Sequence, residues 1–171
     1  MKPSELQITA GTPERALITS RAENLEAVLI ALGLASRNVR CLHRDISVFD
    51  LGSVAATESL QRLLLGHRSA RVRLLVDDTA WLEGQAPRLR ALQRRFPHAL
   101  ELRVASADDP VGDDACLLVD DHATLALKPT AAARGDLWLH NKPHAQPYAT
   151  AFERRWNAGG HNIAVVPLGL G

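Results

Sequence analysis

The side chains best suited to bind a ligand fall in two short polar groups, each directly after an apolar run. The first group is His43-Arg44-Asp45 and the second is Asp77-Asp78. The carboxyl ends of parallel strands are where open α/β sheets bind their ligands. On neighbouring strands, Arg44 would bind an anion and Asp77 would hold His43 or Arg44 through charge-assisted hydrogen bonds. A structural ion-pair cluster at the rim of a sheet is the competing interpretation.

A second candidate is an acidic stretch around a predicted β-hairpin, whose rim carries the most concentrated charge of the chain. Several carboxylate oxygens are what Ca²⁺ and Mg²⁺ require. The spacing is not that of a calcium-binding loop, and acidic rims are common on solvated surfaces. We therefore expect no metal and no cofactor. The carboxylates are Asp108, Asp109, Asp113, Asp114, Asp120 and Asp121.

Other motifs of known chemistry are missing from the sequence. It contains no glycine-rich phosphate loop, no Cys/His spacing for zinc and no Gly-x-Ser-x-Gly turn. The arginines between Arg88 and Arg95 could touch phosphates. Proteins that bind single strands interleave aromatic residues with such a basic track, whereas the aromatic residues here are expected to be buried. An exposed helix face is the favoured interpretation.

Composition is that of a soluble globular chain. Of 171 residues, 46% are hydrophobic and 23% charged, and the net charge of +1 gives no overall attraction to nucleic acid or to an anionic membrane. The first residues lack a secretory apolar core, and the aliphatic stretch 27–35 is too short to span a bilayer. We expect a cytoplasmic protein. Cys41 and Cys116 lie in apolar runs and are interpreted as buried, reduced thiols.

Helices and strands alternate in the pattern. The spacing of apolar residues predicts helices over 21–36, 55–65, 81–96 and 143–157, with Pro87 bending or restarting the third. Ser20 and Glu23 form a capping-box pattern before the first helix. The apolar face of this helix would contain Leu25, Val28, Leu29, Leu32 and Ala35.

Strands are predicted over 38–42, 71–76 and 99–104, followed by a hairpin of 115–119 and 123–127. Residues 6–9 are either a short strand or a loose leader, and 163–166 a final strand. The order predicts an α/β fold with a mixed, mostly parallel sheet and helices on both faces. We expect a leader at 1–16 and a single domain at 17–171.

This arrangement resembles one half of the phospholipase D superfamily. The resemblance covers Leu17 to Trp156 and includes a strand that ends in Leu-Leu-Val-Asp120-Asp121 and a late helix that ends in Phe-Glu-Arg-Arg-Trp156. It is strongest to a phospholipase D-like domain at the C-terminal end of some bacterial GNAT-type acetyltransferases. The shared segments are Ile18–Arg21, His43–Asp45, Ala70–Asp77 and Phe152–Trp156.

The resemblance implies a loss of catalysis. Active members carry His-x-Lys-x-x-x-x-Asp on the matching strand, where the His attacks phosphorus and the Lys neutralises phosphoryl charge. Here Asp120 takes the Asp position, but Asp113 stands at the His position and Ala115 at the Lys position. An Asp nucleophile is repelled by a phosphodiester anion, and Ala binds nothing. No catalytic residue is therefore assigned, and Asp120 joins the candidate ligand-binding residues.

A literal His-x-Lys does occur elsewhere, at His140-Asn141-Lys142. The position where Asp is required is Pro147, and the segment leads into a helix instead of lying on a strand. A solvated loop before the helix is the favoured interpretation.

Three functions remain open. The leading hypothesis is a catalytically inactive phospholipase D-like module with an interaction or regulatory role, partnered with an acetyltransferase or with a second copy of itself. The second is a divergent phosphodiesterase or hydrolase that uses His43, Asp77 and the acidic hairpin. The third is a nucleic-acid-binding domain, although nucleic acid and membranes are not expected as partners.

Overall fold

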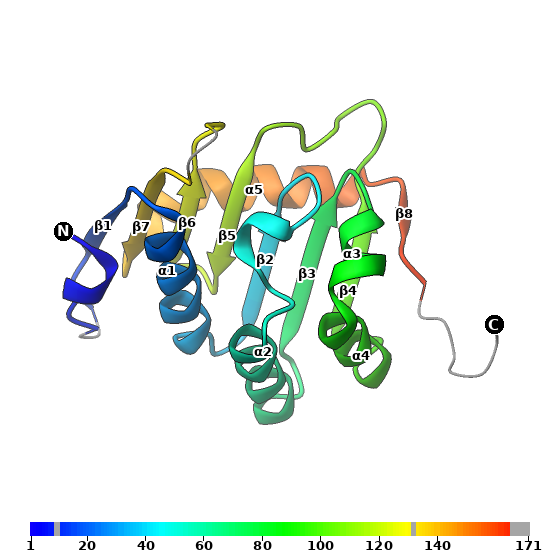
Figure 1. Ribbon diagram of the computed structural model, residues 1–171, viewed down its shortest axis with the longest axis horizontal. Helices are drawn as coiled ribbons and strands as arrows, with labels where there is room; N and C mark the ends of the chain where they lie inside the picture. Colours follow the sequence, from blue (N-terminus) through cyan, green and yellow to red (C-terminus); the bar gives the residue numbers. More distant parts are fainter. Residues whose placement is uncertain (9–10, 131–132, 165–171) are drawn as a thin grey trace.

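An eight-stranded mixed sheet forms the centre of the computed structural model, which describes residues 1–8, 11–130 and 133–164 (Figure 1). The strand order is β1-β7-β6-β5-β2-β3-β4-β8. The strands are β1 (Glu14–Ile18), β2 (Asn38–Leu42), β3 (Arg71–Val76), β4 (Leu100–Val104), β5 (Ala115–Val119), β6 (Ala123–Leu127), β7 (Gly135–Leu139) and β8 (His161–Asn162). The helices are α1 (Arg21–Gly33), α2 (Val54–Gly66), α3 (Ala80–Gln85), α4 (Pro87–Arg95) and α5 (Lys142–Asn157), with 3-10 turns η1 (Pro3–Glu5) and η2 (Ser47–Phe49).

Only the centre of the sheet is parallel. In the described part of the chain, β2 pairs with β3 and β3 with β4 in parallel, and the other five pairings are antiparallel. The mixed sheet is confirmed, but antiparallel pairings outnumber parallel ones, because every pairing on the β1 side of β2 and the pairing of β8 with β4 are antiparallel. The sequence did not predict β7, whose first residue Gly135 lies so close to Ala126 that a side chain there would collide with the main chain.

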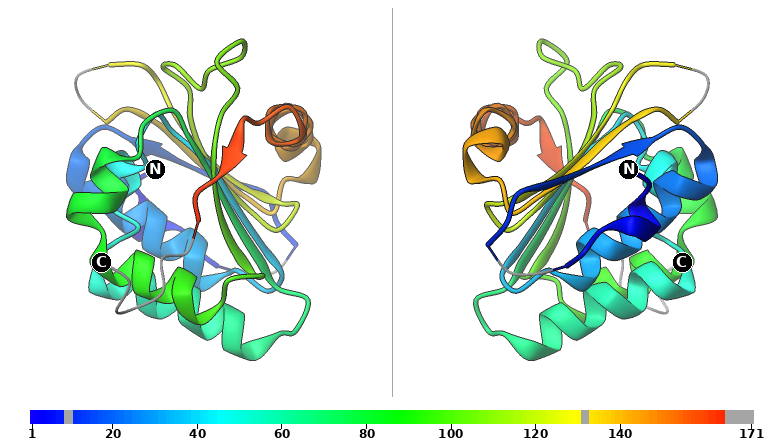
Figure 2. Two further views of the ribbon diagram at one scale, coloured as in Figure 1. Left: turned by 90° about the vertical axis from the view of Figure 1, so that its right-hand side faces the viewer. Right: turned by 90° about the vertical axis from the view of Figure 1, so that its left-hand side faces the viewer.

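Helices cover both faces of the sheet, as expected. Helices α1 to α4 lie on one face and α5 lies alone on the other (Figure 2). The larger core packs under the first four helices, and the smaller one under α5 includes Leu75, Leu118, Phe152 and Trp156. The α/β architecture therefore has two apolar layers, one on each side of the strands.

Helix α1 begins where its capping pattern predicts. The Ser20 hydroxyl accepts a hydrogen bond from the Glu23 N–H, which satisfies one of the free N–H groups of the first turn. The predicted apolar face is confirmed in part, since Val28 and Leu32 are buried, whereas Leu25 and Ala35 are half-buried and Leu29 is exposed. The buried face consists of Asn24, Ala27, Val28, Ala31 and Leu32.

Helix α5 is held on the sheet by charge and by aromatic packing. Glu153 accepts hydrogen bonds from Arg40 on β2 and Arg73 on β3, and these bonds, that to Arg73 above all, lower the pKa of its carboxyl. The guanidinium of Arg73 also lies over the Phe152 and Trp156 rings, 5.4 and 5.5 Å from their centroids.

Most predicted elements are confirmed within a residue or two at their ends. Pro87 restarts a helix, because Ala86 separates α3 from α4. The predicted boundary at residue 16 falls inside β1. Of the short terminal strands that were predicted, residues 6–8 and 163–164 form no strand, and Thr9 and Val165 to Val166 lie outside the described residues. Strands form instead at β1, which the sequence did not predict, and at β8, slightly earlier than predicted. Cys41 and Cys116 are buried free thiols on opposite faces of the sheet.

No helix within residues 1–8, 11–130 and 133–164 combines the length and the apolar character needed to cross a membrane.

Asp120 connects two central strands, at the end of β5 and the start of β2. Its side chain accepts hydrogen bonds from the N–H groups of Ser36, Arg37 and Asn38 and from the Ser36 hydroxyl, at 2.8 to 3.1 Å. The residue is 9% exposed and has a positive φ of 52°. This carboxylate therefore fixes the start of β2 against the end of β5, which is a structural role.

We predict that Asp120→Asn lowers the free energy of unfolding by roughly 2–3 kcal/mol. The carboxylate accepts from main-chain N–H groups with both oxygens, whereas the NH₂ group of Asn would face one or more of these donors and could not accept from them. Asn tolerates the positive φ, so the change tests charge and hydrogen bonding. Urea unfolding measures the loss, and Asp121→Asn, at an exposed neighbour paired with Lys142, is the control. Equal stability of the two variants would contradict the role of Asp120.

Candidate functional site

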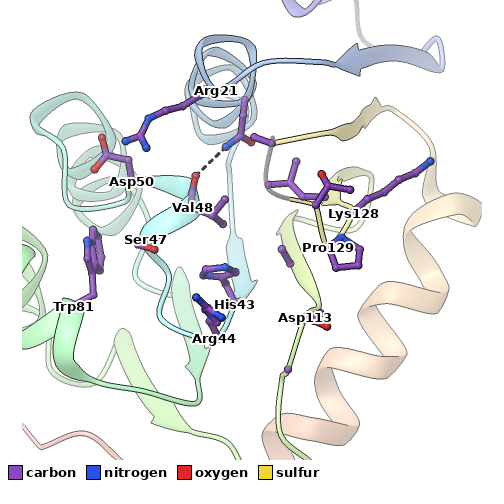
Figure 3. A pocket seen from close by; sticks show the side chains of 16 residues that line it. Arg21, His43, Arg44, Ser47, Val48, Asp50, Trp81, Asp113, Lys128 and Pro129 are labelled. Carbon is purple, nitrogen blue, oxygen red and sulfur yellow. Dashed lines mark hydrogen bonds between the residues drawn. The ribbon is translucent and has the colours of Figure 1, made fainter.

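A cleft of about 650 Å³ opens at the carboxyl end of β2 (Figure 3). One wall comes from the η2 turn and the start of α3, and the opposite wall from the segment before β5 and the turn after β6. The N-terminus of α1 closes the top. Its described lining residues are Arg21, Asn24, His43, Arg44, Ser47, Val48, Asp50, Trp81, Gly112, Asp113, Ala115, Leu127, Lys128, Pro129, Thr130 and Ala133.

His43 lines the base of this cleft. Its Nδ1 accepts hydrogen bonds from the N–H groups of Ile46 at 3.0 Å and Asp45 at 3.4 Å and also lies 3.1 Å from Oδ1 of Asp45. The two main-chain donors oppose a proton on Nδ1, so in the neutral ring they favour the proton on Nε2. Burial lowers the pKa of His43 below its ordinary value, an effect that the nearby Asp45 carboxylate opposes in part. No described residue bonds to Nε2, so this N–H is free to donate to a ligand.

The turn that shapes His43 has an unusual backbone. Ile46 has φ 72° and Asp50 has φ 47°, and they flank η2 on either side. A β-branched residue with positive φ is an outlier, and such strain gathers at ligand-binding segments. The strain of Ile46, which is fully buried, turns its N–H toward the His43 ring.

Cationic side chains from three segments line the cleft. Neither Arg21, Arg44 nor Lys128 forms a side-chain hydrogen bond or ion pair within the described residues. We call these three side chains the basic rim. With two carboxylates in the lining, Asp50 and Asp113, the cleft has a formal charge of three minus two, or +1. Cations that are not neutralised by the protein attract an anionic ligand.

The sequence did not predict Asn24 and Trp81 as site residues. Asn24 is fully buried, its Nδ2 donates to the Val48 carbonyl at 2.9 Å, and its Oδ1 accepts no hydrogen bond within the part of the chain described. The signal for Asn24 was a polar residue on the apolar face of a predicted helix. Trp81 packs partly against the core and lines the cleft with the rest of its ring.

The structure brings only two of the predicted ligand residues, His43 and Arg44, into the cleft. Asp45 accepts from the N–H and hydroxyl of Ser47, and Asp78 accepts from the Ala80 N–H. Asp77 does not hold His43 or Arg44, because its carboxylate accepts from the N–H groups of Val111 and Gly112, both at 2.8 Å. The three carboxylates act as turn anchors.

Asp113 and Ala115, which stand at the positions that the phospholipase D resemblance assigns to the reactive His and Lys, both line the cleft. Asp120 lies at the far end of β5 from them, so it cannot act on the same ligand. The acidic residues of the hairpin therefore lie at opposite ends of β5, with Asp113 before the strand and Asp120 after it. Within the described residues no group of three His, Cys, Asp or Glu side chains could hold a metal.

His140-Asn141-Lys142 forms the start of α5, at the edge of the sheet where Asp120 lies. The Asn141 side chain caps the helix by accepting from the His144 N–H at 3.1 Å, and Lys142 pairs with Asp121 at 2.8 Å. His140 stacks on His122, with 5.5 Å between ring centroids. The expected solvated loop is therefore a helix cap.

A second hollow, of about 880 Å³, lies between α5 and the strands at the β1 side of the sheet. It shares Ala115, Leu127, Lys128 and Pro129 with the cleft, so the two spaces adjoin at the turn after β6. Arg134 lines the second hollow and, in the described chain, has no ion pair.

Comparison with protein families decides the classification. Residues 20–165 match the family described as Domain of unknown function (DUF7931). The chain belongs to the DUF7931 family. A comparison with curated proteins finds no match.

Solved structures share the fold of this DUF7931 domain. Nuc from Salmonella typhimurium, a phospholipase D family member, has a TM-score of 0.64 and 16% identity over 89% of this chain and 99% of its own. NucT from Helicobacter pylori has a TM-score of 0.60 and 8% identity over 86% of this chain and 98% of its own. The DUF7931 domain therefore has a phospholipase D-like fold.

TrmBL2, an archaeal chromatin protein with a novel mode of DNA binding, shares the fold too, with a TM-score of 0.63 and 13% identity. The match covers 89% of this chain and 55% of TrmBL2, so the DUF7931 chain spans about half the length of that protein. The expectation that nucleic acid is not a partner gains no support from this similarity.

Proposed function

We propose that this DUF7931 domain is a catalytically inactive phospholipase D-like module that binds a phosphate-bearing ligand in the cleft. The observation that carries the proposal is the unpaired basic rim around the free Nε2–H of His43. A phosphate oxygen accepts from His43 and Arg44, and guanidinium groups match phosphate geometry in pairs of bonds.

The absence of hydrolysis follows from the lining residues. Asp113 repels a phosphate instead of attacking it, and Ala115 offers no charge to the transition state. The alternative hydrolase with His43, Asp77 and the acidic hairpin is not favoured, since Asp77 is occupied by two main-chain N–H groups and the acidic residues face different edges. Binding without turnover is the chemistry that remains.

The role of the domain is proposed to be regulatory, with the ligand controlling a protein partner. The partner expected from the resemblance, an acetyltransferase or a second copy of the chain, stays a prediction, as do the domain boundaries at 1–16 and 17–171 and a cytoplasmic location.

Binding of inorganic phosphate, followed by isothermal titration calorimetry, should weaken about tenfold or more in Arg44→Glu, because a charge-assisted bond is replaced by repulsion. Lys128→Glu should weaken it less, since Lys128 lies on the rim away from His43 (Figure 3). Arg88→Glu, the same charge change on the exposed side of α4, is the control and should bind like the unchanged protein.

In the same preparation, bis-p-nitrophenyl phosphate should stay intact. Hydrolysis that is lost in Asp113→Ala would refute the inactive state, and equal phosphate binding by Arg44→Glu and Arg88→Glu would refute the cleft as the binding site.

A second candidate, nucleic-acid binding, is favoured by the position of the two hollows, which share four lining residues. A nucleic-acid strand that runs from Arg44 past Lys128 to Arg134 would place successive phosphates beside these cations. The DNA binding of TrmBL2 concerns that protein and motivates the test here.

For this candidate, the binding constant for a single-stranded oligonucleotide should fall linearly with salt on logarithmic axes, with a slope that becomes shallower in Arg134→Ala. Fluorescence anisotropy at several salt concentrations measures the slope. Affinity that is independent of salt would count against nucleic acid.

A further inference from the structure

We propose that the cleft recognises a nucleotide, with the base against Trp81 and the phosphate on the side of Arg44 and His43. This inference rests on the proposed function, because it assigns a second subsite to the ligand whose phosphate the basic rim binds. Trp81 and Asp50 form one wall, and His43 and Arg44 lie beside them at the base of the cleft (Figure 3).

Trp81 is suited to hold a planar ring. It packs partly on the core and otherwise faces the cleft, so its position is set before a ligand arrives. Gly52 lies under it, where an added Cβ would be 3.5 Å from Cη2 of the indole and 3.3 Å from Ala86. A ring fixed in this way stacks on a base at little entropic cost, whichever base it is.

Asn24 and Asp50 supply acceptors for the edge of a base. Asn24 Oδ1 is an unpartnered acceptor among the described residues, on a fully buried side chain whose amide group is fixed by Val48. Asp50, next to the strained η2 turn, adds a carboxylate to the same lining. A phosphate mainly accepts hydrogen bonds, and its negative charge is repelled by the Asp50 carboxylate, whereas the amino and ring N–H groups of a base donate to such acceptors.

The volume agrees with such a ligand. A cleft of about 650 Å³ lies within the usual range of small-ligand sites, roughly 300–1,000 Å³. Inorganic phosphate alone would leave most of this space and both acceptors unused. The nucleotide can be free or can be the terminal unit of a strand, because the same stacking and phosphate contacts serve both.

Calorimetry with a set of matched ligands tests the subsite. Ribonucleoside 5′-monophosphates should bind about tenfold more tightly than ribose 5-phosphate, since the stacked base contributes affinity that the sugar phosphate lacks. Trp81→Leu should remove this advantage and leave ribose 5-phosphate binding unchanged, whereas Trp81→Phe should retain most of it. Trp138→Leu, on β7, is the control and should behave like the unchanged protein.

The outcomes separate this inference from the proposed function. Equal binding of ribose 5-phosphate and the mononucleotides would overturn the base subsite and leave the phosphate site standing. If ribose 5-phosphate and the mononucleotides both fail to bind, and Arg44→Glu does not change phosphate binding, the base subsite and the phosphate site are both overturned. A 5′-phosphorylated hexanucleotide that binds when mononucleotides do not, and whose binding is lost in Trp81→Leu, would show that the ligand is the end of a nucleic-acid strand. Hexanucleotide binding that Trp81→Leu does not change would overturn the inference.

Discussion

The antiparallel pairing of β5 with β2 determines where everything functional in this domain lies. In this register Leu42 is opposite Cys116, so the residues just before β5 come to the carboxyl end of β2, beside His43. At the other end Val39 is opposite Val119, which brings Asp120 onto the N–H groups that precede β2. A slip of one residue would turn Cys116 and its neighbours to the wrong face and would separate the cleft walls.

Two carboxylates stabilise this pairing, one at each end of the central strands. Asp120 binds three main-chain N–H groups at the start of β2, and Asp77 binds two in the segment before β5. Both resemble site residues in the sequence because both follow a strand. Their oxygens are used by the fold, and the cleft is left to side chains whose polar atoms are free, above all Arg44 and His43.

Much of the fold could be predicted from the sequence, because capping residues and strand periodicity act locally. Ser20, Pro87 and the apolar runs of β2 and β3 gave correct elements. β7 was missed, since its pairing with β1 joins residues far apart in the chain and its sequence begins with glycine. For the site, strand ends correctly indicated His43 and Arg44. Trp81 and Lys128 come from distant elements that only the folded sheet brings together.

The domain is therefore a phospholipase D-like sheet with a cleft at the carboxyl end of β2. Asp113 and Ala115 stand in the lining where a nucleophile and a cation would be expected, while the basic rim keeps the attraction for an anion. Affinity for phosphate and attack on phosphorus depend on different groups.

The titration of His43 by NMR tests most directly whether this cleft binds phosphate. Burial holds the pKa of its ring below the ordinary value in the free protein. A phosphate anion beside Nε2 favours the protonated ring, so the account predicts that the pKa of His43 rises when inorganic phosphate replaces chloride at equal ionic strength. His67, exposed at the end of α2, is the control, and its ring signals should not respond to phosphate. A His43 titration that phosphate does not alter, or a shift that His67 shares, would contradict the account.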